Sequence, residues 1–255
     1  MNMLRADIGY FFGSSRIWAA VIMGTLLILR PVIEVWRMGA GSMFSPMELL
    51  SLPLAISDFT PFAPIFCAIP YATSFCDDYK SGYLRFVAVR VGVKKYCAGR
   101  VVSIAMSGAM VMAVIFGLTM TASVTSAGMP ETVDTVSFME STIWARMDWL
   151  LPHRGLMTFA GRLLLASLFG AVWALAALGI STWIPNRHVA LIAPFVLYQA
   201  LWLLLMNSFL NPLFMLRADD SRIPSLLFVI AYQFAWIAVW GAVCYRGMKR
   251  RCANA

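Results

Sequence analysis

Few residues in this chain have the type and spacing that catalysis or metal binding needs. The two histidines, His153 and His188, fall in segments that we expect on opposite sides of a membrane, so we do not expect them to share a metal ion. No serine-hydrolase elbow, zinc-protease motif or phosphate-binding loop occurs in the sequence. We therefore expect no metal, no cofactor and no enzymatic activity on this chain. A membrane enzyme is an alternative that has no candidate active site.

The cysteines give no pattern for a metal site or a disulfide framework. No Cys-x-x-Cys motif occurs, and no cysteine falls in a segment that we expect outside the cell. An odd number of cysteines facing membrane or cytoplasm is typical of free thiols. The residues concerned are Cys67, Cys76, Cys97, Cys244 and Cys252.

The most distinctive polar segment covers residues 76–100. It begins with CDDYKSGYLR and ends with VGVKKYCAGR. Aromatic, aliphatic and basic side chains at 83, 86, 87 and 90 can share one face of a short helix, with Gly82 and Gly92 at its two ends. Such a helix at a membrane edge suits docking onto a soluble partner protein. The alternative is a basic loop that contacts anionic lipid headgroups.

Six long apolar runs must position this polar segment. The chain is 61% hydrophobic and 13% charged, whereas soluble domains have about a quarter of their residues charged. A membrane-spanning helix needs about 20 apolar residues. We therefore predict an all-α polytopic membrane protein with a single domain over 1–255. Its predicted spans are about 17–36, 58–75, 101–121, 163–184, 189–209 and 226–245.

Local patterns refine three parts of this arrangement. Residues 1–16 carry apolar side chains at helical spacing, which predicts an amphipathic helix on the membrane surface, with a frayed terminus as the alternative. The second span contains Pro61, Pro64 and Pro70, so we expect it to be kinked or irregular. The third has small residues at four-residue spacing, which suits close helix packing or is ordinary sequence variety. These are Ala109, Ala113, Gly117 and Thr121.

The distribution of charge predicts how the chain is oriented. With six spans, the side that holds both termini carries thirteen basic and three acidic residues, and the other side carries seven basic and nine acidic residues. Basic residues concentrate on the cytoplasmic side of membrane proteins, so we expect both termini in the cytoplasm. The same rule explains the net charge of +8 without nucleic acid, which we do not expect as a partner.

The predicted spans contain almost no titratable groups. No Asp, Glu, Lys or Arg lies between Asp58 and Asp77, or between Arg100 and Glu131. The same holds over residues 163–186, 188–216 and 223–245. Ionisable groups inside a membrane usually mark proton or ion pathways. If the chain moves a substrate, the energy is therefore expected to come from another subunit.

The polar segment and the layout together resemble a known family. The sequence FCDDYKSGYLR at 75–85, followed by KKYCAGR at 94–100, resembles the loop after the second span in ATP-binding-cassette (ABC) export permeases of the second type. Those proteins have six spans, cytoplasmic termini and an amphipathic N-terminal helix. They also have a break before the last span, which Asn211-Pro212 resembles. The long loop 122–158 and the proline-rich second span depart from the family pattern.

The resemblance implies a coupling element at about 77–95 that contacts a separate ATPase subunit, which would hold ATP and Mg. Two permease subunits, identical or related, would pair in a cell membrane, which we expect to be the bacterial plasma membrane. A hydrophobic, peptide or drug-like cargo is expected. The residues that correspond to docking positions are Asp77, Asp78, Tyr79, Gly82 and Arg85. A non-transporting membrane protein, such as an immunity, sensor or assembly subunit, is the main alternative.

Overall fold

The structure is a computed structural model of the whole chain, and it describes residues 14–37, 54, 57, 59–70, 74–84, 86, 90, 92–127, 154–217 and 225–253. Helices and turns make up these residues, and none of them lies in a β-strand. The predicted all-α class is therefore confirmed. The predicted N-terminal amphipathic helix lies outside the described residues, as does most of the long loop 122–158.

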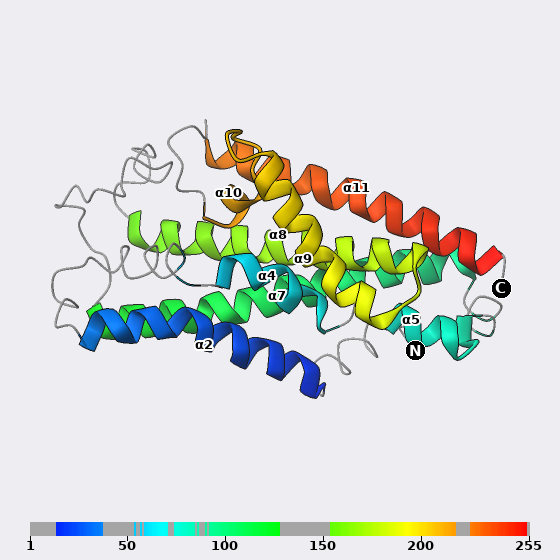
Figure 1. The fold of residues 1–255 in the computed structure, drawn as a ribbon, viewed down its shortest axis with the longest axis horizontal. Coiled ribbons are helices and arrows are strands. Elements are labelled where there is room, and N and C mark those ends of the chain that lie inside the picture. Colours follow the sequence, from blue (N-terminus) through cyan, green and yellow to red (C-terminus); the bar gives the residue numbers. More distant parts are fainter. Residues whose placement is uncertain are drawn as a thin grey trace.

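Five long helices form the body of the protein (Figure 1). Each has a stretch that is long and apolar enough to cross a membrane. Large apolar side chains also lie exposed on their outer faces, for example Leu26, Val196 and Leu227, and such surface belongs in lipid. The chain is a multi-pass membrane protein. The five helices are α2 (Ser15–Arg37), α7 (Val93–Ala127), α8 (Arg154–Trp183), α9 (Arg187–Leu204) and α11 (Leu226–Ala253).

The predicted second span is not one continuous helix. Residues 59–68 form α4 (Phe59–Ala68), a turn follows at Ile69 and Pro70, and α5 (Ser74–Lys80) begins after it. Ten helical residues rise about 15 Å, which is half of the hydrocarbon core of a bilayer. The expected irregularity is therefore confirmed, while the continuous span over 58–75 is wrong. Proline lacks the backbone donor that a helix needs, which explains why α4 stops at this point.

Several helix boundaries differ from the predicted spans. Helix α7 begins at Val93 rather than 101, α8 begins at Arg154 rather than 163, and α11 continues through the basic tail to Ala253. Hydropathy marks only the apolar part of a helix, whereas backbone hydrogen bonding continues into polar sequence until a breaker stops it. Helix α9 shows the opposite error. It ends at Leu204 rather than 209, and turns lead to the short helix α10 (Pro212–Arg217).

Helix α8 is the central helix of the bundle. It packs against α7, α11, α9 and α4, and it is the most buried of the five long helices. Two glycines allow its closest contact, which is with α7. A Cβ atom built on Gly108 would lie 2.3 Å from the carbonyl oxygen of Gly170, and one built on Gly170 would lie 2.2 Å from that of Gly108. The two backbones therefore touch, and no larger residue fits at either position.

The contact face of α7 differs from the small-residue stripe that the sequence suggests. Gly108 and Met112 face α8, whereas Ala109 and Ala113 are only partly buried and Thr121 is exposed. Gly117 has open space around the position of a Cβ atom. The stripe is therefore ordinary sequence variety, and the packing face lies one position to its side.

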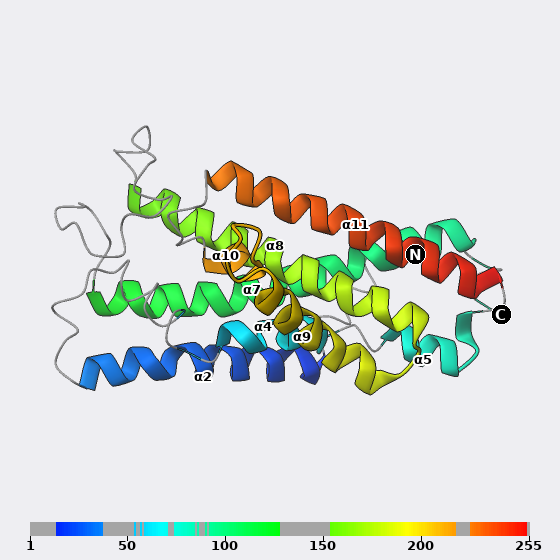
Figure 2. The ribbon, with the colours of Figure 1, turned by 45° about the horizontal axis from the view of Figure 1, so that its top comes forward.

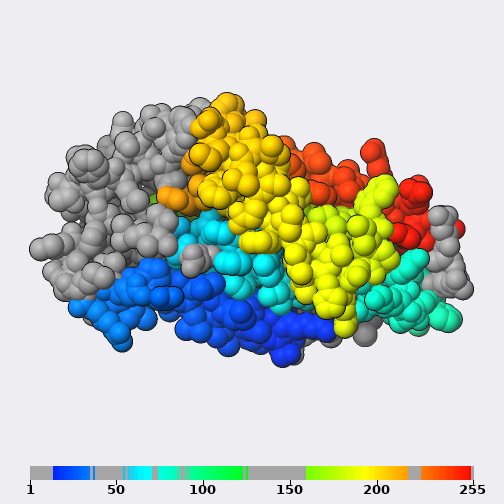
Figure 3. Space-filling view, in the orientation of Figure 1, coloured from blue at the N-terminus to red at the C-terminus, as the bar shows by residue number. Residues whose placement is uncertain are grey.

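The remaining helices surround the α7–α8 pair. Helix α9 lies on the outside of the molecule and crosses in front of α4 (Figures 1 and 3). Phe62 of α4 and Phe195 of α9 stack with ring centroids 5.3 Å apart. Along the chain, the direction alternates in the order α2, α4, α7, α8, α9 and α11 (Figures 1 and 2). Helix α5 therefore lies at the same end of the bundle as the start of α7, the end of α8 and the end of α11.

The glycine contact gives a testable expectation for folding. Gly108→Ala or Gly170→Ala places a methyl group inside the van der Waals radius of a backbone oxygen, and we expect a loss of about 1–3 kcal/mol. Unfolding of the purified protein by denaturing detergent measures this change.

Gly117→Ala, in the same helix α7, is the matched control. Its Cβ atom would contact nothing within 4 Å, and alanine is the better helix former, so stability should be unchanged or slightly higher. Equal destabilisation by all three substitutions would contradict the backbone contact.

Candidate functional site

The candidate docking segment begins with α5, and Gly82 ends this helix. The amide of Gly82 donates to the carbonyl oxygen of Tyr79 at 3.3 Å, and the amide of Ser81 donates to that of Asp77 at 3.0 Å. Gly82 has a φ of +69°, which glycine adopts without strain and which commonly ends a helix. A second glycine, Gly92 with a φ of +85°, precedes α7. Both glycines thus have a positive φ at the positions where the sequence places the ends of a short helix, most of which lies outside the described residues.

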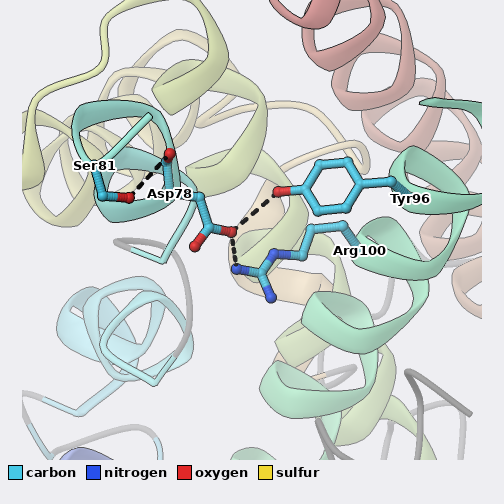
Figure 4. A network of polar contacts seen from close by, with 4 residues as sticks. All are labelled: Asp78, Ser81, Tyr96 and Arg100. Atoms are coloured by element: carbon cyan, nitrogen blue, oxygen red, sulfur yellow. Dashed lines mark hydrogen bonds and ion pairs between the residues drawn. The ribbon is translucent and has the colours of Figure 1, made fainter. Parts of the chain in front are cut away.

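Asp78 joins α5 to the first turns of α7 (Figure 4). One of its carboxylate oxygens accepts a hydrogen bond from the hydroxyl of Tyr96 at 3.0 Å and pairs with the guanidinium of Arg100. The side chains of Asp78 and Arg100 are only 19% and 8% exposed. A charge this buried requires an opposite charge and hydrogen bonds beside it. Asp78 is therefore committed to α7.

Asp77 joins α5 to the first residue of α9. The guanidinium of Arg187 binds both of its carboxylate oxygens, at 2.9 and 3.0 Å. Asn186 caps α9 by accepting a hydrogen bond from the amide of His188 at 3.0 Å, and this fixes the position of Arg187. The two parallel hydrogen bonds of this ion pair fix the orientation of α5 relative to α9. Because the pair is exposed to solvent, it contributes little to stability.

Tyr79 joins α5 to the end of α11. The guanidinium of Arg251 lies over its ring, 5.4 Å from the centroid. The same arginine donates to the backbone oxygens of Thr182 and Trp183 at the end of α8, at 3.0 and 2.6 Å. These carbonyls have no partner within their own helix and carry its negative dipole end, so a cation stabilises them. Three consecutive residues of α5 thus contact three different long helices.

Beyond Gly82 the segment presents its side chains to the outside. Leu84 is buried, but Tyr83 and Phe86 are 53% and 73% exposed. Exposed basic residues precede and follow them in the sequence, namely Lys80, Arg90, Lys94 and Lys95. The buried Phe75 and Leu84 hold the segment against the bundle, packed with Tyr96 and Cys97 of α7. An aromatic and basic surface therefore projects from a fixed base.

The structure divides the predicted docking residues into two groups. Asp77, Asp78 and Tyr79 hold α5 against the bundle, and Gly82 turns the chain outward, while Arg85 lies outside the described residues. The predicted orientation places Arg187 and Arg251 on the same side as these residues, but the sequence does not indicate which ion pairs form. Tyr96 and Arg100 are four residues apart along α7, a helical spacing that could have indicated a shared partner.

The cysteine and acidic side chains of the described site do not gather in one cluster. All five cysteines are free, and in the described part of the chain no three His, Cys, Asp or Glu side chains gather as a metal site would require. Burial raises the pKa of the Cys76 thiol, and the neighbouring carboxylate of Asp77 raises it further. A protonated, buried thiol is a poor nucleophile. The arrangement instead suits mechanical attachment.

Comparison of the chain with known proteins found no matching family model, no similar curated protein and no similar solved structure.

The two aspartates of α5 should differ in their contribution to stability. Asp78→Asn removes the carboxylate that faces the buried guanidinium of Arg100, and we expect a loss of about 3 kcal/mol. Thermal unfolding in mild detergent measures this change.

Asp77→Asn is the matched control, because it makes the same chemical change one residue away in an exposed pair. It should leave the melting temperature almost unchanged, since solvent screens this ion pair. A larger effect of Asp77→Asn than of Asp78→Asn would contradict the assignment of these contacts.

Proposed function

We propose that the chain is the membrane-spanning permease subunit of an ABC exporter, and that a separate ATPase subunit supplies its energy. The observation that carries this proposal is the attachment of α5. Its residues contact α7, α9 and α11 through Asp78, Asp77 and Tyr79. A soluble subunit that moves the adjoining segment would therefore pull on several membrane helices at once.

The surface that receives this partner is formed by the residues beyond Gly82. Tyr83 and Phe86 supply large exposed aromatic groups, and such groups often carry the binding energy of a protein interface. The lysines and arginine that flank them in the sequence favour a partner with an acidic surface. We therefore assign docking to Tyr83 and Phe86, which we call the exposed tip, rather than to Asp77 and Asp78. The two aspartates would transmit the movement of the tip to the membrane helices.

The course of the chain supports six passes with both ends in the cytoplasm. Helices α2, α7 and α9 run in one direction, and α4, α8 and α11 run in the other (Figure 1). Helix α4, continued by the turn at 69–70 and by α5, would complete the second pass. Among the described residues, the end that holds α5 carries most of the basic side chains, as expected of a cytoplasmic face.

The energy source follows from the polar groups inside the bundle. The charge of the buried Arg100 is neutralised by Asp78. The only acidic residue in the described long helices is Glu34, which pairs with Arg30 at 3.1 Å. A proton-driven pump needs a carboxylate or histidine that can change its charge in the path. ATP hydrolysis on a partner subunit supplies the driving force without such a titratable group.

The cargo is proposed to be hydrophobic, peptide-like or drug-like, because the helices are apolar and rich in aromatic residues.

Docking can be tested by substituting the exposed tip. The double variant Tyr83→Ala and Phe86→Ala should fold normally, because both side chains are exposed, yet lose the partner ATPase during purification in mild detergent. Loss of two aromatic anchors typically costs about 2 kcal/mol or more each at an interface. Co-purification from the native membrane followed by mass spectrometry measures the retained ATPase.

Ile184→Ala is the control, since this side chain is also exposed at the same end of the bundle but lies just after α8. The control variant should keep the ATPase. Recovery of no ATPase with the wild-type chain would overturn the exporter assignment and favour a non-transporting membrane protein.

Transport should require the partner. In vesicles that contain the chain alone, a fluorescent hydrophobic cargo should not accumulate against its gradient, with or without ATP or a proton gradient. With the co-purified ATPase and ATP, accumulation should begin. Uphill accumulation by the chain alone would contradict the proposed energy source.

A further inference from the structure

A pocket lies between the end of α8 and the end of α11. It has a volume of about 270 Å³, and its walls are Thr182, Trp183, Gly247, Arg250 and Arg251. A cavity that holds one water needs roughly 10–15 Å³ on this measure, so this pocket accepts a group of several atoms. We propose that it binds the phosphodiester headgroup of an anionic phospholipid.

The floor of the pocket is held in place by a close helix contact. A Cβ atom built on Gly247 would lie 2.2 Å from the hydroxyl oxygen of Thr182 and 2.8 Å from its Cβ atom. The same hydroxyl donates to the backbone oxygen of Gly179 at 2.7 Å. Helices α8 and α11 are therefore in direct contact at the pocket.

The positive charge at the pocket exceeds what the described residues neutralise. Arg251 is used to bind the last carbonyls of α8. Arg250 lies with its guanidinium 5.7 Å from the ring centroid of Trp183 and makes no hydrogen bond or ion pair with another described residue. Arg246 and Lys249 add two exposed charges on the same helix end. The two acidic residues of the nearby α5 are already paired with Arg187 and Arg100.

The surroundings favour a lipid over a soluble anion. The pocket lies where two membrane-spanning helices end, and Trp183 and Ile184 beside it are 58% and 52% exposed. Tryptophan at such a position anchors a helix at the membrane interface. Basic pockets between helix ends at this level suit anionic headgroups. A bound phospholipid would place its phosphate against Arg250 and its acyl chains along the apolar faces of α8 and α11.

The proposal is tested by measuring lipid binding to the purified full chain. Native mass spectrometry in mild detergent, with dioleoyl phosphatidylglycerol or dioleoyl phosphatidylcholine added, reports the affinity for each lipid. We expect preference for the anionic lipid, and Arg250→Gln should weaken its binding about tenfold, as for loss of one charge-assisted hydrogen bond. Lys94→Gln removes the same charge from an exposed position on α7 and should leave the affinity unchanged.

Other outcomes would overturn the proposal. Equal weakening by Arg250→Gln and Lys94→Gln would mean diffuse attraction rather than a site. Competition by inorganic phosphate at the concentration at which the lipid binds would mean a site for free anions. Loss of a co-purified protein with unchanged lipid binding would mean a protein contact. If Arg250→Gln fails to fold, Arg250→Lys and the preference of the wild-type chain between the two lipids provide the same test. Equal binding of the two lipids by the wild-type chain would overturn the proposal.

Discussion

The close approach of α7 and α8 is the constraint on which the rest of the structure depends. Lipid gives apolar helices little reason to associate, so contact between them must come from close packing. Gly108 and Gly170 allow the two backbones to touch. Helix α8 then has its opposite side free for α11, which it meets where Gly179 faces Trp240 and Thr182 faces Gly247. The cytoplasmic end proposed for the bundle is built on these three helices.

Polar interactions at that end repeat one arrangement. Each places a basic group where a helix begins or ends: Arg100 near the start of α7, Arg187 at the start of α9 and Arg251 at the end of α11. Two of them hold the aspartates of α5, and the third holds the carbonyls of α8 and the ring of Tyr79. These polar contacts fix the short helix α5 in addition to its buried Phe75, which packs in an apolar cluster with Tyr96 and Cys97.

The same end of the bundle carries two surfaces of different character. One is the aromatic tip with Tyr83 and Phe86, which suits a soluble protein, and the other is the arginine pocket between α8 and α11, which suits a lipid headgroup. They are connected through Arg251, which lies over Tyr79 and donates to the carbonyls that line the pocket. A lipid in the pocket would therefore strengthen the base from which the proposed docking segment projects.

The sequence alone determined the all-α membrane class, five of the six predicted spans as long apolar helices and the irregular course of the second span, because each follows from local hydropathy or local backbone chemistry. It also marked the polar segment as the distinctive one. It could not determine which side of α7 meets α8, since Gly108 and Gly117 look equally suitable until a partner backbone is present. Nor could it assign Asp77 to Arg187 or Asp78 to Arg100, because ion pairs between distant residues depend on how the helices pack. Only the tertiary structure decided that the aspartates hold the segment against the bundle, because their partners lie on helices that are distant in the sequence.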